Sequence, residues 1–383
     1  MSEVSAVPIY LDCAATTPLD PAVFKALSHW SHEEFGNAGS RTHAYGSRAK
    51  RAVTQARGQI AAVAGCRPEE VVFTSGATEA NNLAILGLES HGREKDRRHL
   101  LTTALEHKAV LEPFQVLGQR GFEIEVLQPE PGGWVAPEQL AAHLRPDTLL
   151  VSIMHVNNET GVRQPIPEFA EVLQDSAAYF HVDGAQGFGK IFGELENPRI
   201  DFMSLSGHKI FGPKGIGALV ARRRGFQKPP LQPLMFGGGQ ERGLRPGTLP
   251  VASIVGLGLA AELAHKNQAA RSQRCADFRD RLLLALAPLK PVFHGDRSRT
   301  VPHILNLSFP GLDSEAAILA LKDLIAVSNG SACTSQSYEP SHVLTAMGLT
   351  DARVQGAVRL SWCHGTADPD WGAVVARLVE LVR

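Results

Sequence analysis

The stretch Val71-Val72-Phe73-Thr74-Ser75-Gly76-Ala77-Thr78-Glu79 does most to decide the fold, because an apolar β-branched run passes directly into the helical pattern of residues 80–88. A short strand that feeds a helix through a glycine turn is the repeating unit of an α/β sheet. Residues 76–78 then lie at a helix N-terminus, where exposed amides and the helix dipole favour a phosphate. The same residues fit an ordinary capped helix equally well, since Ser or Thr followed by Glu is a common start signal.

Further apolar runs alternate with longer segments of helical period along the chain, and this alternation predicts a mainly parallel sheet covered by helices. Strands are expected at residues 100–103, 149–154 and 179–182. Asp20-Pro21 is a helix start, and a long, largely helical region is expected between Pro250 and Pro288. Beyond Pro302 the pattern changes to shorter strands and helices, which indicates a second, smaller α+β domain.

Polar residues gather where three of these strands end. Thr78 follows the first strand, the run His155 to Gly161 follows another, and Asp183 to Gln186 follows the strand at 179–182. In open parallel sheets ligands bind at the carboxyl ends of the strands. The three clusters therefore predict one shared site.

Lys209 lies in the run Leu205-Ser206-Gly207-His208-Lys209-Ile210-Phe211-Gly212-Pro213-Lys214-Gly215-Ile216-Gly217. Taken alone, this run is most simply a basic turn between two strands. A lysine amine can also form an imine with the aldehyde of pyridoxal phosphate, and small residues beside it leave room for a flat ring. That cofactor needs a carboxylate opposite its ring nitrogen. Asp183, 26 residues earlier (209 − 183 = 26), is the candidate.

Composition excludes several classes of function. The chain has 383 residues, 44% of them hydrophobic, which is enough for a large core divided in two. Its 38 basic and 39 acidic residues give no electrostatic basis for direct nucleic-acid or membrane binding. The N-terminus lacks a secretory pattern, so a cytoplasmic protein is expected. The five cysteines form no CxxC pair, so neither a disulfide framework nor a structural metal site is predicted.

Six ordered motifs carry a family resemblance. The sequence resembles the cysteine desulfurases, in the class V group of pyridoxal-phosphate aminotransferase-like enzymes, from Leu11-Asp12 to Arg359. The motifs are Phe73 to Leu83, Glu106-His107, His155 to Gly161, His181 to Gln186, Ser206 to Lys209, and Gly237 to Arg242. Any one of them is a weak signal, whereas all six in order are highly specific.

The resemblance implies the α/β fold type I of these transferases and a homodimer. The large domain, expected over 14–260, has a mainly parallel seven-stranded sheet, and a small α+β domain comprises 1–13 and 261–383. The implied cofactor is pyridoxal 5′-phosphate, with Lys209 as Schiff-base lysine and His107 as stacking and acid/base group. The other implied cofactor contacts are Asp183 (ring nitrogen), Gln186 (ring oxygen), Asn158, the phosphate ligands Ala77, Thr78, Ser206 and His208, and Thr248, which reaches the neighbouring subunit's phosphate.

Cys333 is the expected sulfur-accepting nucleophile. It lies in a Gly/Ser-rich stretch, about 328–340, where an exposed thiol can act. The number and spacing of the cysteines alone would instead favour a cysteine without a function in a polar loop. The resemblance to the long-loop subgroup implies that Cys333 takes sulfur from L-cysteine as a persulfide, releases alanine and passes the sulfur to an acceptor protein. Iron-sulfur cluster assembly, tRNA thiolation and DNA phosphorothioation remain open as destinations. The resemblance leaves Cys13, Cys66 and Cys275 as structural residues.

The substrate carboxylate requires a cationic partner, and Arg359 is the candidate because a guanidinium binds a carboxylate through two hydrogen bonds. Asn37 and Asn158 are expected to assist. The chain departs from the family where Leu360 to Gly365 replaces the usual Leu-Gly-Arg-like turn, and Cys13 is also unusual at its position. Cys363 with His364 is a weaker candidate for a second thiol site.

Two other functions stay open from the sequence. A selenocysteine lyase or an aminotransferase would keep Lys209 and Asp183 without needing Cys333. A catalytically silent scaffold that binds a sulfur-trafficking partner would need neither Lys209 nor Asp183 nor Cys333.

Overall fold

The computed structural model describes residues 7–329 and 340–382. Within these residues the largest sheet has seven strands in the order β2-β8-β7-β6-β5-β3-β4. β8 runs antiparallel to both of its neighbours, β2 and β7, and the other adjacent strands of this sheet are parallel, so the predicted mainly parallel α/β sheet is confirmed. The strands are β2 (Val71–Thr74), β3 (His99–Thr103), β4 (Glu123–Leu127), β5 (Thr148–Met154), β6 (Tyr179–Asp183), β7 (Phe202–Ser206) and β8 (Gly217–Ala221).

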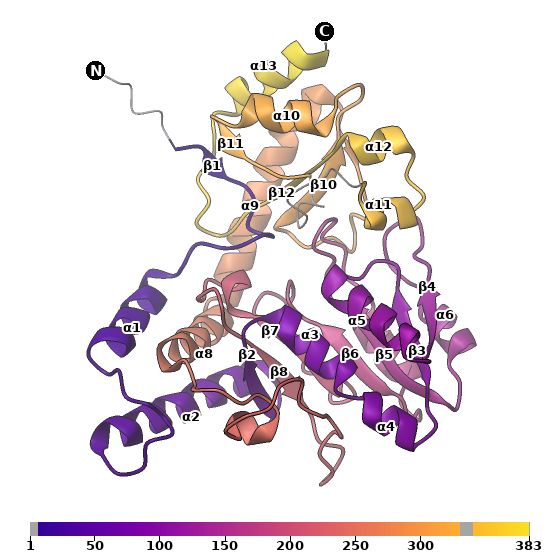
Figure 1. The fold of residues 1–383 in the computed structure, drawn as a ribbon. Helices are drawn as coiled ribbons and strands as arrows, with labels where there is room; N and C mark the ends of the chain where they lie inside the picture. The colour runs from indigo at the N-terminus through magenta and orange to yellow at the C-terminus, as the bar shows by residue number, and fades with distance from the viewer. Residues whose placement is uncertain (1–6, 330–339, 383) are drawn as a thin grey trace.

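Both faces of this sheet are buried, because alternate residues of each strand point to opposite sides. Val72 packs with the helices α3 and α5, whereas Val71 and Phe73 pack in a separate core with α2, α7 and α8. Figure 1 shows α3 and α5 lying over the sheet. The helices around the sheet are α1 (Pro21–His32), α2 (Ala44–Ala64), α3 (Ala77–Leu86), α4 (Glu89–Glu94), α5 (Lys108–Gln119), α6 (Pro137–His143), α7 (Ile166–Val172) and α8 (Val251–Lys266).

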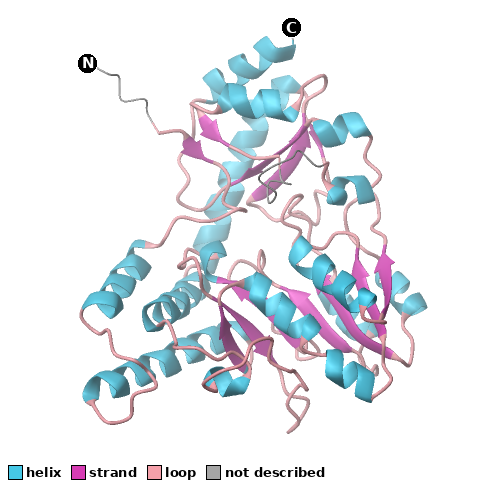
Figure 2. Ribbon diagram, viewed as in Figure 1, coloured by secondary structure: helices cyan, strands magenta, loops and turns pink. Residues whose placement is uncertain are grey.

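A second group of elements, at the top of Figure 2, combines both ends of the chain. The short strand β1 (Ile9–Tyr10) pairs in parallel with β11 (Ile325–Ala326), more than 300 residues later in the chain. Beside them, β9 (Val292–Phe293), β10 (Ile304–Ser308) and β12 (Ala357–Ser361) form an antiparallel sheet. The helices of this part are α9 (Gln268–Leu286), α10 (Ser314–Leu321), α11 (His342–Ala346), α12 (Asp351–Gln355) and α13 (Trp371–Val382).

This second group has a hydrophobic core of its own, built around Phe278, Leu307 and Trp362. No helix in the described part of the chain is long and apolar enough to cross a membrane.

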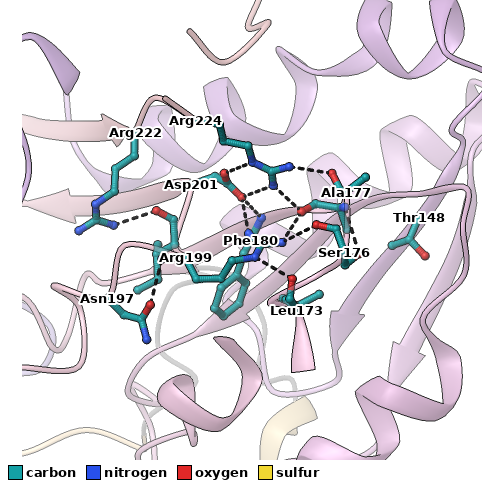
Figure 3. Close-up of polar contacts among 12 residues, drawn as sticks. Thr148, Leu173, Ser176, Ala177, Phe180, Asn197, Arg199, Asp201, Arg222 and Arg224 are labelled. Carbon is teal, nitrogen blue, oxygen red and sulfur yellow. Dashed lines mark hydrogen bonds and ion pairs between the residues drawn. The ribbon is translucent and has the colours of Figure 1, made fainter. Parts of the chain in front are cut away.

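An arginine–aspartate cluster lies at the amino ends of β6 and β7, opposite the strand ends that carry the polar motifs (Figure 3). Asp201 is buried and accepts from the guanidinium groups of Arg199, at 2.8 Å, and Arg224, at 2.6 Å. Its Oδ2 also accepts from the backbone amide of Phe180, at 2.7 Å. Because these contacts satisfy the buried charge and tie β7 to β6, the cluster has a structural role.

Candidate active site

A pocket of about 620 Å³ lies at the carboxyl ends of β5, β6 and β7 and at the N-terminus of α3. It brings together most residues that the sequence proposes for the cofactor. The side chains that line it include Ala77, Thr78, His107, Asn158, Asp183, Gln186, Ser206, His208 and Lys209. These residues lie far apart in sequence and meet because parallel strands end at the same edge of the sheet.

Lys209 enters the pocket from a one-turn 3₁₀ helix that follows β7 directly. The turn is held by backbone hydrogen bonds from Gly207 to Ile216 and from Gly212 back to Gly207, both 2.9 Å. The Lys209 Nζ donates to the carbonyl oxygens of Ala14 and, at 2.9 Å, Ala15. The segment after β1 therefore holds the amine at the pocket.

The turn depends on a close backbone approach at Gly217, the first residue of β8. A Cβ atom there would lie 2.4 Å from the carbonyl oxygen of Leu205 and 2.6 Å from the Cα of Gly76. Only glycine fits this position without movement of the backbone, so Gly217 sets how closely the Gly76 turn and the lysine turn approach each other.

Asp183 ends β6, and the residue is 6% exposed. Its Oδ2 accepts a 2.8 Å hydrogen bond from Asn81 Nδ2, and its Oδ1 accepts from the backbone amide of Ala185 at 2.9 Å. Asn81 lies one turn into α3 and is buried. These two donors orient the carboxylate at the pocket, where a cationic ring nitrogen would find a partner.

The phosphate end of the pocket is the N-terminus of α3, with Ala77 and Thr78 in its first turn. Ser206 and His208 line the pocket beside them. Burial, with a smaller contribution from the adjacent Lys209, lowers the pKa of His208 to about 4. His208 is therefore neutral at pH 7, and a hydrogen bond of 3.1 Å joins its Nδ1 to Thr16 Oγ1.

His107 lines the pocket from the N-cap position of α5, where its Nδ1 accepts the amide of Ala109 at 3.1 Å. The preceding residue, Glu106, is fully buried and accepts from Thr103 Oγ1 and from the amide of Met154, both at 2.8 Å. Burial raises the pKa of Glu106 to about 8. The Glu106 carboxyl group is therefore protonated at neutral pH.

The residues present fit pyridoxal phosphate. A buried carboxylate, a lysine amine and a helix N-terminus face one pocket, as an aldehyde cofactor with a pyridine nitrogen and a phosphate would require. Gln186 Nε2 donates to the Ala14 carbonyl at 2.8 Å, and its buried Oε1 has no hydrogen-bond partner among the described residues. A polar atom of this kind at a pocket wall is satisfied when a ligand or water occupies the space.

Three predicted site residues do not line this pocket. Asn37 and Thr248 are exposed outside it. Arg359 is buried on β12, donating to Asp12 Oδ1 at 2.6 Å and to the carbonyl of the pocket residue Asn158 at 3.0 Å. Cys333 lies outside the described residues.

Several residues of the site were missed by sequence reasoning. Asn81 holds Asp183, Asp12 pairs with Arg359, and the carbonyls of Ala14 and Ala15 accept from Lys209. An asparagine on the apolar face of a predicted helix was the available signal for Asn81. No local pattern indicates backbone carbonyls that arrive from the far end of the chain. Among the described residues, no cluster of His, Cys, Asp and Glu is arranged to hold a metal ion.

Comparison with known proteins gives consistent matches over nearly the whole chain. The model of the aminotransferase class-V family matches residues 9–370. The cysteine desulfurase IscS of Pectobacterium carotovorum is 46% identical over 380 residues, covering 98% of this chain and 92% of the relative. IscS of Escherichia coli is 45% identical, with the same coverage.

Solved structures agree with this match. The crystal structure of DndA from Streptomyces lividans is 52% identical, with a TM-score of 0.82, covering 92% of this chain and 99% of that one. A NifS-like protein is 34% identical, with a TM-score of 0.88 and 98% coverage of both chains. The structure of SspA in complex with cysteine is 36% identical, with a TM-score of 0.81, covering 94% of this chain and all of that one.

Proposed function

Because the chain belongs to the aminotransferase class-V family and is a cysteine desulfurase, we propose which of its own residues carry out the conversion of L-cysteine to L-alanine. The observation that supports the proposal best is the convergence of Lys209, Asp183 and His107 on one pocket at the strand ends. Members of this family use pyridoxal phosphate, as the sequence predicted.

Pyridoxal phosphate, when bound, supplies an electron sink that makes the α-proton of an amino acid acidic. Lys209 would hold the cofactor through its amine and Asp183 would keep the ring nitrogen protonated. The first turn of α3 at Ala77 and Thr78, with Ser206 and His208, would hold the phosphate. Gln186 and Asn158 would contact the ring, with His107 over its face.

The substrate carboxylate is assigned to Arg359, with Asn37 and Asn158 assisting. Asp12 and the Asn158 carbonyl fix the plane of the Arg359 guanidinium, which matters because two-point binding of a carboxylate depends on that plane. Lys209 then moves the α-proton. His107, at the pocket wall, takes the proton of the substrate thiol.

Cys333 is proposed as the sulfur acceptor. Its thiolate attacks the substrate sulfur, a sulfur–sulfur bond forms, the carbon–sulfur bond breaks and the electron pair stays with the carbon skeleton, which leaves as alanine after protonation. The persulfide on Cys333 is then transferred to an acceptor protein. The destination, whether iron-sulfur clusters, tRNA or DNA phosphorothioation, is served through that protein without direct nucleic-acid binding by this chain.

A homodimer in the cytoplasm is the proposed assembly. Thr248 is exposed and lies outside the pocket of its own chain, which agrees with the proposal that it contacts the phosphate held by the partner subunit. A small polar hydroxyl at the end of a loop is suited to such a contact.

Activity of Cys333→Ser tests the assignment. The variant should lose sulfur transfer to a protein acceptor in the presence of L-cysteine, while Cys66→Ser, which changes a thiol outside the pocket, should retain it. Undiminished transfer by Cys333→Ser would reject Cys333 as the acceptor and assign the sulfur to another thiol.

A further inference from the structure

A second pocket, separate from the proposed cofactor site, is lined by three of the five cysteines. It has a volume of about 50 Å³, and its wall includes Cys13, Cys275 and Cys363 together with Lys190. One water needs roughly 10–15 Å³ of such volume, so a molecule the size of hydrogen peroxide can enter. Cys13 and Cys363 come together because the segment after β1 lies beside the end of β12. Cys275 joins them from α9, where its carbonyl accepts from Trp362 Nε1 at 2.9 Å.

Cys13 and Cys363 line this pocket from two segments that are hydrogen-bonded to each other. The backbone holds them together: the amide of Cys13 donates to the carbonyl of Ser361 at 3.0 Å, and the amide of Ala14 donates to Ser361 Oγ at 2.8 Å. Cys275 contributes only a small electrostatic effect, on the pKa of Cys13.

The surroundings favour a thiolate on Cys363. Its sulfur accepts a hydrogen bond from Thr366 Oγ1 at 3.5 Å. The neighbouring Cys13 thiol lowers the pKa of Cys363 to about 6; burial opposes this effect, and Thr366 adds to it. The neighbouring Cys363 sulfur, together with burial, raises the pKa of Cys13 far above its usual value. Other titratable and charged groups at this pocket are Lys190, Arg271, Cys275, His303 and His364.

We propose that Cys13 and Cys363 form a dithiol oxidation site, which a peroxide converts to a disulfide. Cys363 is the reactive thiolate, because it is partly exposed and its sulfur accepts a hydrogen bond from Thr366, and Cys13 is the resolving thiol. Sequence reasoning assigned Cys13 a structural role, since nothing local connects it to a residue 350 positions later (363 − 13 = 350).

The chemistry balances with hydrogen peroxide as the oxidant. The Cys363 thiolate attacks one peroxide oxygen, the oxygen–oxygen bond breaks, hydroxide leaves and a sulfenic acid forms. The Cys13 sulfur then attacks the sulfenic sulfur, the sulfur–oxygen bond breaks, and the Cys13 proton leaves with the hydroxyl as water. The two sulfurs together lose two electrons, and the peroxide gains them.

Peptide mapping tests this directly, because trypsin places each cysteine in a different peptide. Cys13 lies in 1–25 and Cys363 in 360–377, whereas Cys66, Cys275 and Cys333 lie in 58–93, 275–279 and 323–353. The full-length cofactor-loaded protein is treated with hydrogen peroxide, its remaining thiols are alkylated, and it is digested without reduction. The expected product is a cross-link between 1–25 and 360–377 that a thiol reductant reverses.

Variants separate the two roles. Cys13→Ser should lose the cross-link and gain a trapped sulfenic acid on Cys363 that dimedone labels. Cys363→Ser should lose both, and Cys275→Ser, the matched change in the same pocket, should keep the cross-link. Absence of the 1–25 to 360–377 cross-link in the wild type after complete consumption of peroxide, or a dominant cross-link through 275–279, would overturn the proposal.

Discussion

Asp183 illustrates how much of the site depends on one buried carboxylate. Its two donors, Asn81 and the amide of Ala185, fix its position without neutralising it, so its charge remains available to a ring nitrogen. Charge aimed at a reacting group from a preorganised position is often the largest catalytic contribution that a protein makes.

Asp183→Asn should therefore lower kcat by about 100-fold or more, because an amide cannot hold the ring nitrogen in its protonated form. Steady-state alanine production measures kcat, and cofactor titration shows whether binding survives. Asn81→Ala, which removes a donor to Asp183 but leaves its charge, should have a smaller effect. Equal losses in the two variants would contradict a role for the charge itself.

Glu106 gives a pH-dependent signature. Its pKa rises from 4.5 to about 8 on folding, so between those values the folded protein binds a proton that the unfolded chain releases. The contribution of Glu106 to the free energy of unfolding is fully present below about pH 4.5 and is lost as pH rises toward 8. The free energy of unfolding then falls by at most about 1.4 kcal/mol per pH unit.

Glu106→Gln imitates the protonated group and should remove this part of the pH dependence. The difference in unfolding free energy between Glu106→Gln and the wild type, measured by denaturant titration from pH 5 to 8, should change in favour of the variant as pH rises. A difference that stays constant across this range would show that Glu106 is ionised in the folded protein.

Chemically distinctive residues were predictable from the sequence, whereas their supporting contacts were not. Lys209 and Asp183 stand in motifs whose residue types suit a cofactor, and both line the pocket. The acceptors of Lys209 and the partner of Arg359 come from residues 12–15, nearly 200 or more positions away. Pairings over such distances are set by tertiary packing, which no local pattern encodes.

At the scale of elements, apolar periodicity predicted most of the central strands. The expected strands at 100–103, 149–154 and 179–182 correspond to β3, β5 and β6 within a residue or two. β4 was not predicted, because this strand is at the sheet edge and carries Glu123 and Glu125, so its pattern is less apolar. The long helical region between Pro250 and Pro288 is divided into α8 and α9 at Asn267.

The contact between β8 and the Gly76 turn provides a test of element packing. Gly217→Ala places a methyl group against backbone atoms at 2.4 and 2.6 Å and should cost about 1–3 kcal/mol of stability. It should also weaken cofactor binding, because the turn at Gly76 carries the phosphate end of the pocket.

Gly58→Ala is the matched control for Gly217→Ala. Gly58 lies within α2, and a Cβ atom there would meet nothing within 4 Å, so this change should stabilise the protein by up to about 1 kcal/mol. Thermal unfolding of both variants measures the contrast. A Gly217→Ala protein as stable as the wild type would show that the backbone can separate here without cost.

At the scale of the whole molecule, the two ends of the chain meet in one hydrophobic core that Leu11, Phe278 and Trp362 share. The sequence indicated a change of pattern after Pro302, and the family resemblance supplied the return of the N-terminus. The domain limits at residues 13 and 260 stay a prediction. Pairing of β1 with β11 cannot be read from local periodicity, because a two-residue strand has none.

The proposed dimer should complete each cofactor site with the partner's Thr248. Light scattering should give twice the chain mass, and Thr248→Ala should bind pyridoxal phosphate more weakly while remaining dimeric. A mixed dimer of Lys209→Ala and Thr248→Ala chains is the sharper experiment.

In that mixed dimer one site combines both substitutions and the other has neither, so half of the sites should bind cofactor with wild-type affinity. If no site kept wild-type affinity, Thr248 would belong to the pocket of its own chain, which would contradict the proposal.

Mass analysis of the 323–353 peptide after a single turnover tests the central claim most directly. With stoichiometric L-cysteine, the wild-type protein should release one alanine per active site, and this peptide, which carries Cys333, should gain the mass of one sulfur atom that a thiol reductant removes. The 360–377 peptide should remain unchanged. Alanine release without added sulfur on the 323–353 peptide, or sulfur found on another cysteine, would contradict the account.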